Sequence, residues 1–275
     1  MSMVINTNMG SLNAVRLLDQ SSKEQSLAME KLTSGLRINK AADDAAGLAV
    51  ATKMDTQIRG TDQAIQNAND GISLVQTLDG ATEEVVGMLQ RMRELGVQSI
   101  NGTYNAENRA QMNEEFTQLQ NEIDRIANTT KFNETSLMNG SNTAVLVHVG
   151  WNVGADNKIS IGLTDFNVSA LNTDTNVSLG TVTAASAAVQ TIDQDLSNLN
   201  LQRAKWGALQ NRLESTVSNL TNVNENMTSA KSRILDADFA KESANLARTQ
   251  VLQQAGMSML SQANQQSQNV MSLLQ

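Results

Sequence analysis

Few residues of this chain have side chains suited to catalysis or metal binding. Its single histidine is His148, and it has no cysteine. Zinc sites built from His and Cys, and Ser–His or Cys–His catalytic sets, are therefore excluded. The chain also lacks the Gly-Lys-Ser/Thr end of a phosphate-binding loop. His148 lies in a short apolar run typical of a strand, which favours a half-buried or edge position over a role as ligand or base.

The adjacent acids Asp43 and Asp44, in the stretch AADDAAG, are the other candidates for a metal site. Neighbouring residues on a helix point in different directions, so two carboxylates placed this way do not converge on an ion. Acids near the start of a helix instead complement its dipole. We interpret both as capping residues of a following helix. No nucleophile and base are left to form a catalytic set, so the sequence predicts a protein that is not an enzyme and needs no cofactor.

Long helices dominate the pattern around these residues. Apolar residues at alternating steps of three and four predict an α-helix that packs along one stripe. The longest seam is interrupted by Arg203, Gln210, Asn224 and Lys231, and it comprises Val189, Ile192, Leu196, Leu199, Trp206, Leu213, Val217, Leu220, Met227 and Ile234. Other seams comprise Met112, Phe116, Leu119, Ile123 and Ile126; and Ile58, Ile65, Ala68, Ile72, Val75 and Leu89, beside a parallel stripe of Leu78, Val85 and Met92.

Both ends of the chain lack charge. Residues 1–15 and 249–275 contain no charged side chain. Each end also carries a thin heptad pattern, with Val15, Leu18 and Met29 near the start and Met257 and Leu260 near the end. A helix with so thin a seam buries too little surface to be stable alone. We therefore expect both ends to fold only against neighbours.

The middle of the chain has a different character. Two β-rich runs, Ala144–Val149 and Lys158–Leu163, are separated by Gly, Asn and Asp and predict a hairpin. The Ser/Thr/Asn-rich stretch after them indicates a surface loop. The order of elements is nearly palindromic, so we predict a chain that folds back at its middle and brings its ends together. The predicted class is mainly α, a long antiparallel helical rod or coiled-coil bundle with a small β-hairpin region.

Charge and hydropathy exclude several partners. The net charge of −8 argues against binding to nucleic acid or to an anionic membrane. No Lys/Arg cluster followed by an apolar run stands at the start, so we expect no cleavable signal peptide. Gln, Asn and Ser interrupt the apolar positions of the last segment, which is not expected to cross a membrane.

Four stretches resemble one protein family, the bacterial flagellins. They are INTNMGSLNA from residue 5, KLTSGLRINKAADDAAGLAVATKM over 31–54, LQRMRELGVQSINGTYN over 89–105, and the final stretch over 232–275 that begins SRILDADFAKE. They occur in the order and at the spacing of the family, across roughly residues 4–138 and 185–275. Ser267 stands where family members often have Pro, and Phe239 where they often have Tyr.

The resemblance implies a domain plan. Residues 1–42 and 232–275 would form the inner, filament-core domain, and residues 43–138 and 185–231 the helical domain outside it. Residues 139–184 would form the β-hairpin and a Ser/Thr-rich surface loop. The chain resembles a minimal flagellin that lacks separate outer domains.

The resemblance also implies function and partners. The chain would be exported unfolded by the flagellar type III route and would polymerise into the extracellular flagellar filament. Copies of itself, the filament cap, hook-junction proteins and an export chaperone would be its partners. Two alternatives are a hook–filament junction protein and, in another class, a coiled-coil signalling or adaptor protein. The residues expected to pack in the filament core are Ile5, Leu12, Val15, Leu18, Met29, Leu32, Leu36, Leu252, Met257, Leu260, Met271 and Leu274.

Two further surfaces follow from the resemblance. The stretch QRMRELGVQ is similar to the segment that the flagellin-sensing Toll-like receptor of animals binds, and the implied contacts are Gln90, Arg91, Leu95 and Glu115. The Ser/Thr-rich stretch lies where flagellins are often O-glycosylated. The implied acceptors are Ser169, Thr173, Thr175, Ser178, Thr181, Thr183 and Ser186.

Overall fold

The computed structural model describes residues 7–171, 173 and 177–272, with the backbone alone for 266–272. The chain forms two compact units. The first combines residues 1–56 with 226–275, and the second comprises residues 57–225. The division falls inside two long helices, after the expected limit at 42/43 and before the expected limit at 231/232.

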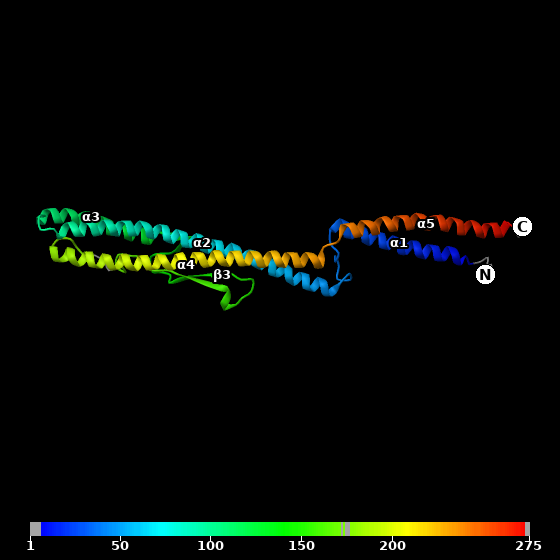
Figure 1. Ribbon diagram of the computed structural model, residues 1–275, viewed down its shortest axis with the longest axis horizontal. Coiled ribbons are helices and arrows are strands. Elements are labelled where there is room, and N and C mark those ends of the chain that lie inside the picture. The colour runs from blue at the N-terminus through cyan, green and yellow to red at the C-terminus, as the bar shows by residue number, and fades with distance from the viewer. Residues whose placement is uncertain (1–6, 172, 174–176, 273–275) are drawn as a thin grey trace. The chain divides into compact units, whose positions relative to one another are not determined.

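The fold is mainly α with small antiparallel strand pairs in the middle, as the sequence predicts (Figure 1). The helices are α1 (Met9–Ser34), α2 (Ala45–Ile100), α3 (Ala106–Thr129), α4 (Val182–Leu235) and α5 (Phe239–Ser272), with a short 3₁₀ helix η1 (Ala155–Asn157). The strands are β1 (Lys131–Phe132), β2 (Thr135–Ser136), β3 (Ala144–His148) and β4 (Lys158–Gly162).

The start of α2 is capped as the sequence predicts. The Asp44 carboxylate accepts a hydrogen bond from the Gly47 backbone N–H at 2.8 Å. The Asp43 carboxylate accepts the N–H groups of Lys40 at 2.9 Å and Asn39 at 3.0 Å. These bonds favour the charged form and hold the pKa of Asp43 below its usual value. Asp44 therefore satisfies a backbone donor that the start of α2 leaves unpaired, whereas Asp43 binds backbone donors of the loop before the helix, so the capping prediction is confirmed for Asp44 alone.

The second unit contains the apolar core. Every apolar residue of the α4 seam that lies in this unit, from Val189 to Leu220, is buried or half-buried. Helix α2 is buried along both predicted stripes, which is why it contacts neighbours on two sides. The largest fully buried side chains include Trp206, Phe116, Phe166, Leu78 and Leu89. The predicted seams are therefore confirmed as core positions.

Side-chain pairs set the register of α2 against α4 in the second unit. The Arg93 guanidinium meets the Asp193 carboxylate at 2.5 Å, and the Arg203 guanidinium meets that of Asp79 at 2.7 Å. Asp79 precedes Arg93 on α2, whereas their respective partners, Arg203 and Asp193, come in the reverse order on α4. The two helices are therefore antiparallel. Arg203, which interrupts the apolar seam, is thus an interhelical partner.

The predicted hairpin is present. Strand β3 pairs with β4 in antiparallel register, with Ala144 opposite Gly162 and His148 opposite Lys158. His148 is half-buried in β3, as predicted. The Trp206 indole Nε1–H donates to the Gly162 carbonyl oxygen at 3.1 Å, and this bond ties the hairpin to α4.

The Ser/Thr-rich stretch was predicted to be a surface loop, and this prediction is wrong for much of it. Its described part lies along α3, held by three α3 side chains: Asp124 accepts from the Val168 N–H at 2.7 Å, Gln120 donates to the Thr173 carbonyl, and Asn113 accepts from the Leu179 N–H at 2.8 Å. Buried residues anchor it, namely Val168, Leu171, Thr173 and Leu179. Polar composition hid this packing, because the bonds use backbone groups that any residue supplies.

Helices in the described part of the chain are not apolar enough over sufficient length to span a membrane. Among the same residues, no three His, Asp or Glu side chains come together in a way that would hold a metal ion.

Candidate assembly surface

The first unit is built on two antiparallel helices, α1 and α5, which lie side by side in Figure 1. The Asn8 side-chain amide donates to the Ala263 carbonyl at 3.0 Å near one end. Farther along, the Ser21 hydroxyl donates to the Thr249 carbonyl at 3.2 Å, and Lys31 lies 3.8 Å from Glu242. These contacts bring the two terminal helices together, as the palindromic order predicts.

Small and polar residues line the contact between α1 and α5. The side chains of α1 that are buried or half-buried at heptad spacing are Ser11, Ala14, Leu18, Ser21, Gln25, Ala28 and Leu32, and those of α5 are Glu242, Leu246, Thr249, Gln253, Gly256, Leu260 and Ala263. Half of each predicted seam faces inward, since Leu18, Leu32 and Leu260 belong to this set. At the other positions of the predicted seams, the inward residue is the one just before the predicted residue. Ala14 and Ala28, for example, face inward in place of Val15 and Met29.

The small residues let the two helices approach closely. A Cβ atom placed on Gly256 would lie 3.3 Å from Cγ of Leu18, tighter than most real contacts. Close approach leaves little room for larger side chains between the helices. Val15, Met29 and Met257, which share the predicted seams, therefore remain exposed to solvent.

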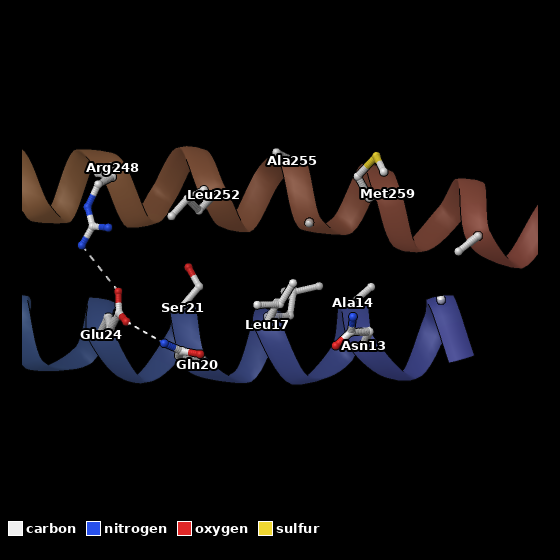
Figure 2. A pocket seen from close by; sticks show the side chains of 14 residues that line it. Asn13, Ala14, Leu17, Gln20, Ser21, Glu24, Arg248, Leu252, Ala255 and Met259 are labelled. Carbon is white, nitrogen blue, oxygen red and sulfur yellow. Dashed lines mark hydrogen bonds and ion pairs between the residues drawn. The ribbon is translucent and has the colours of Figure 1, made fainter. Parts of the chain in front are cut away.

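A groove of about 580 Å³ runs between α1 and α5 (Figure 2). Leu17 borders it from α1, and Leu252 and Met259 border it from α5. At one end the Arg248 guanidinium lies 3.5 Å from the Glu24 carboxylate, the ion pair drawn across the groove in Figure 2. Most of its lining is apolar or small, so an apolar partner would gain from covering it.

Apolar side chains are exposed along both helices, at the groove and beyond it. On α1 these are Met9, Leu12, Val15, Leu17, Leu27 and Met29, and on α5 they are Phe239, Val251, Leu252, Met257 and Met259. Of the residues expected to pack in the filament core, Leu12, Val15, Met29, Leu252 and Met257 are exposed, and Leu18, Leu32, Leu36 and Leu260 are half-buried. Ile5, Leu274 and the Met271 side chain lie outside the described residues.

The segment between α1 and α2 is tied to the end of α4 by a residue that the sequence did not single out. The Arg37 guanidinium donates to the backbone carbonyls of Arg233 and Ile234, at 3.2 and 2.5 Å. Beside it, Leu36 forms an isolated antiparallel bridge with Asp236. A cation at these carbonyls caps a helix C-terminus and complements its dipole.

The predicted receptor contacts divide between surface and core. Gln90, Arg91 and Glu115 are exposed, and the Arg91 Nε donates to the Glu115 carboxylate at 2.8 Å, which joins α2 to α3. Charge-assisted bonds to Glu115 and Glu94 raise the pKa of Arg91. Leu95, however, is buried in the core of the second unit, so it is not available as a surface contact of the folded chain. Leu95 follows the buried Met92 by three residues and therefore lies on the same buried stripe of α2.

The predicted glycosylation sites also differ in access. Ser169, Thr181, Thr183 and Ser186 are exposed, and Ser178 is half-buried. Thr173 is fully buried where this stretch lies against α3, so its hydroxyl is not accessible to modification in the folded chain. Thr175 lies outside the described residues.

Comparison with known families shows matches at both ends of the chain. Residues 5–143 match the bacterial flagellin N-terminal helical region, and residues 189–274 match the bacterial flagellin C-terminal helical region.

Relatives match over nearly the whole chain. A flagellin of Halalkalibacterium halodurans is 48% identical over 273 residues, covering 99% of this chain and all of the relative. A flagellin of Bacillus subtilis is 41% identical over 305 residues, with 99% and 100% covered. A flagellar filament core protein of Treponema maltophilum is 41% identical over 286 residues, again with 99% and 100% covered.

Solved structures agree on the fold. The crystal structure of Bacillus cereus flagellin is similar with a TM-score of 0.51 and 30% identity, and it covers 60% of this chain and 94% of that one. A putative flagellar hook-associated protein from Vibrio parahaemolyticus has a TM-score of 0.59 at 15% identity, covering 70% of this chain and all of that one. At that identity the second likeness concerns the fold alone.

Proposed function

This chain belongs to the bacterial flagellin family, and from that premise we propose that it is the structural subunit that polymerises into the extracellular flagellar filament. The observation that carries the proposal is the row of exposed apolar residues on α1 and α5. Large apolar surfaces on a soluble chain mark sites of association. The three relatives described above carry flagellin or filament-core names, which favours this function over that of a junction protein.

The lack of charge at both ends supports the same proposal. A helix that must be covered by several neighbours cannot carry charges there without losing their hydration, at a cost of several kcal/mol per ion. Residues 249–275 instead carry Gln, Asn and Ser, which form hydrogen bonds without an ionic desolvation cost. In the proposed assembly the groove between α1 and α5 receives an apolar face of a neighbouring copy.

The assembly proposal is tested by a charge placed in the groove. Leu17→Asp changes a residue that is 57% exposed in α1, and Leu201→Asp changes one that is 58% exposed in α4 of the second unit. Both monomers should keep their stability within about 0.5 kcal/mol, as surface substitutions do. Only Leu17→Asp should fail to form filaments in electron micrographs, because burial in the assembly would strand its carboxylate.

Two results would contradict the proposal. Filaments of normal length from Leu17→Asp would show that the groove stays open to water in the assembly. Equal loss of filaments from Leu201→Asp would show that the effect of a charge is not particular to the terminal helices.

Export and accessory partners belong to the same proposal. A chain without disulfides, whose terminal helices contact each other mainly through small residues, suits passage in the unfolded state by the flagellar type III route. The cap, the hook-junction proteins and an export chaperone would be its accessory partners. Secretion measured in cells that lack the flagellar export apparatus tests the route, and secretion at the normal level there would refute it.

We also propose a receptor contact, narrowed by the structure to Gln90, Arg91 and Glu115. The Arg91–Glu115 bond gathers exposed polar groups of α2 and α3 into one surface that a receptor can bind. Arg91→Ala monomer should signal less than unchanged monomer through the flagellin-sensing receptor in a reporter assay. Equal signalling by the two would refute the contact.

Glycans, if attached to native filaments, are proposed at the exposed acceptors Ser169, Thr181, Thr183 and Ser186. Intact mass of the native protein decides this point. A mass equal to that of the sequence would show that no glycan is present.

A further inference from the structure

The methionines of this chain are divided between solvent and core. Among the described residues, the exposed ones all lie on the two terminal helices: Met9 is 71%, Met29 48%, Met257 56% and Met259 61% exposed. Those of the second unit are buried or half-buried, namely Met88, Met92, Met112 and Met138. A thioether is a substrate for oxidation only where an oxidant reaches its sulfur. The surface that carries the assembly proposal is therefore also the readily oxidised surface of the chain.

Met259 occupies a sensitive position on this surface. Its side chain borders the groove between α1 and α5, across from Ala14 and Asn13 (Figure 2). Met257 is exposed on the same helix, and Met9 and Met29 are exposed on α1. All four stand among the other exposed apolar residues of these helices, so a change in their polarity changes the surface offered to a neighbouring copy.

We propose that Met9, Met29, Met257 and Met259 are oxidation sites, and that their conversion to sulfoxide keeps a free subunit out of the filament. The inference rests on the proposed function and adds a chemical control to it. The reactant is a two-electron oxidant of the peroxide class. The sites are open in the free chain and would be covered in the assembly.

The reaction needs no other component. A lone pair of the methionine sulfur attacks one peroxide oxygen, a sulfur–oxygen bond forms and the oxygen–oxygen bond breaks. The departing hydroxide takes up the proton of the transferred hydroxyl and leaves as water. Sulfur loses two electrons to become the sulfoxide, and peroxide is reduced by two electrons.

The product opposes assembly because it is polar. A thioether packs readily into irregular apolar gaps. A sulfoxide oxygen is instead a hydrogen-bond acceptor, and covering it with apolar side chains leaves it without the water it had before. The core of the second unit should remain intact under mild oxidation, since Met92 and Met138 are fully buried.

The experiment treats the purified full-length chain with hydrogen peroxide, removes the peroxide, and measures the critical concentration for filament formation. Peptide mass mapping should find a gain of about 16 Da at each exposed methionine and none at Met92 or Met138. The oxidised chain should show a critical concentration at least tenfold higher, with its circular dichroism unchanged. Assembled filaments treated in the same way should keep Met259 reduced.

A matched variant isolates the four sites. The quadruple change Met9→Leu, Met29→Leu, Met257→Leu and Met259→Leu nearly preserves side-chain volume and removes the sulfur, and such exchanges are well tolerated. It should assemble like the unchanged chain before and after peroxide. A second measurement treats the oxidised unchanged chain with methionine sulfoxide reductases for both epimers, which should restore assembly.

Each outcome decides the matter. Normal assembly of the oxidised chain overturns the inference, and so does an equal loss of assembly in the peroxide-treated quadruple variant. If the quadruple variant fails to assemble before treatment, reductase rescue decides, and absence of rescue overturns the inference. Failure of the untreated, unchanged chain to form filaments overturns the proposed function itself, and this inference with it.

Discussion

The second unit encloses Trp206, Phe116 and Leu89 almost completely, whereas the first unit leaves Met9, Leu17 and Met259 open to solvent. Both units are built from long helices with heptad patterns. In the second, large apolar side chains fill the space between helices and add α3, the hairpin and the segment 164–181 as further layers. In the first, two helices meet largely through Ala, Ser, Thr and Gly, with a few leucines such as Leu18 between them, and many of their large side chains point elsewhere. Burial within one chain thus stabilises the second unit, while the first has most to gain from a neighbour.

The largest expected difference between the units is the effect of removing a large side chain from the monomer. Trp206→Ala deletes a buried ring that packs edge to face on Phe166, with ring centroids 5.9 Å apart, and that donates to the Gly162 carbonyl. It should lower the free energy of unfolding by about 3–5 kcal/mol. Leu17→Ala, in the exposed groove, should change it by less than about 0.5 kcal/mol. Denaturant unfolding of both monomers measures the contrast.

A loss of several kcal/mol from Leu17→Ala would break the comparison. It would mean that the monomer already uses the groove side chains for its own stability, and that the first unit does not depend on neighbours.

The second largest effect comes from a polar residue inside the second unit. Asp195 stands on α4 between Ile192 and Leu199, at a heptad position that faces the core. It is buried, and among the described residues its Oδ2 atom has no hydrogen-bond partner. Loss of hydration raises the pKa of this carboxyl to about 7, from an ordinary value of 3.8.

The raised pKa of Asp195 predicts how stability depends on pH. Between about pH 4 and pH 7 the unfolded chain has ionised this carboxyl while the folded chain keeps it protonated, so folding becomes less favourable as pH rises through that window. The total loss is on the order of 4 kcal/mol, at about 1.4 kcal/mol per pKa unit. Asp195→Asn cannot ionise and should be free of this loss, so its advantage over the unchanged chain grows from pH 4 to pH 7 and then stays constant.

The matched control for Asp195 lies two residues away. Asp193→Asn removes an exposed carboxylate that pairs with Arg93 at 2.5 Å, and it should keep the pH profile of the unchanged chain. Unfolding free energies measured from pH 4 to pH 8 give both profiles. Parallel profiles for Asp195→Asn and the unchanged chain would show that Asp195 is hydrated in the fold.

The sequence predicted the second unit better than the first for a physical reason. Large apolar residues at heptad spacing mark α4 and α3, and β-rich runs mark β3 and β4, because these elements pack by their large side chains. The contact between α1 and α5 uses Ala14, Ser21 and Gly256, which are small or polar and add little to an apolar pattern. A one-residue displacement of half of each seam was therefore not visible before the structure.

Other errors have related causes. Leu95 was expected at the surface because it follows Arg91 by four residues, but α2 is buried along two stripes and Leu95 lies on one of them. The segment 168–186 was expected to be a surface loop because it is rich in Ser, Thr and Asn. Its attachment to Asn113, Gln120 and Asp124 uses backbone groups, which composition does not reveal. Asp195 was not singled out, because the predicted seam runs through its neighbour Leu196.

The smallest expected effect is the difference in stability between two glycine-to-alanine variants, one in each unit. Gly207 lies in α4 of the second unit with open space at its Cβ position, whereas a Cβ on Gly256 of α5 would meet Leu18 at 3.3 Å. Alanine is favoured over glycine in a helix interior by about 0.8–1.0 kcal/mol. Gly207→Ala should therefore stabilise the monomer by most of that amount. In Gly256→Ala the added methyl presses on Leu18, so the gain should be smaller or reversed.

Thermal unfolding of the two alanine variants, followed by circular dichroism, measures this difference directly. Equal stabilisation by Gly207→Ala and Gly256→Ala would mean that Leu18 moves aside without cost and that α1 and α5 are only loosely packed. A clear deficit for Gly256→Ala would mean that close approach of the two helices is built into the single chain. Small residues on α5 would then serve the pairing with α1, which frees Met257 and Met259 to face other copies.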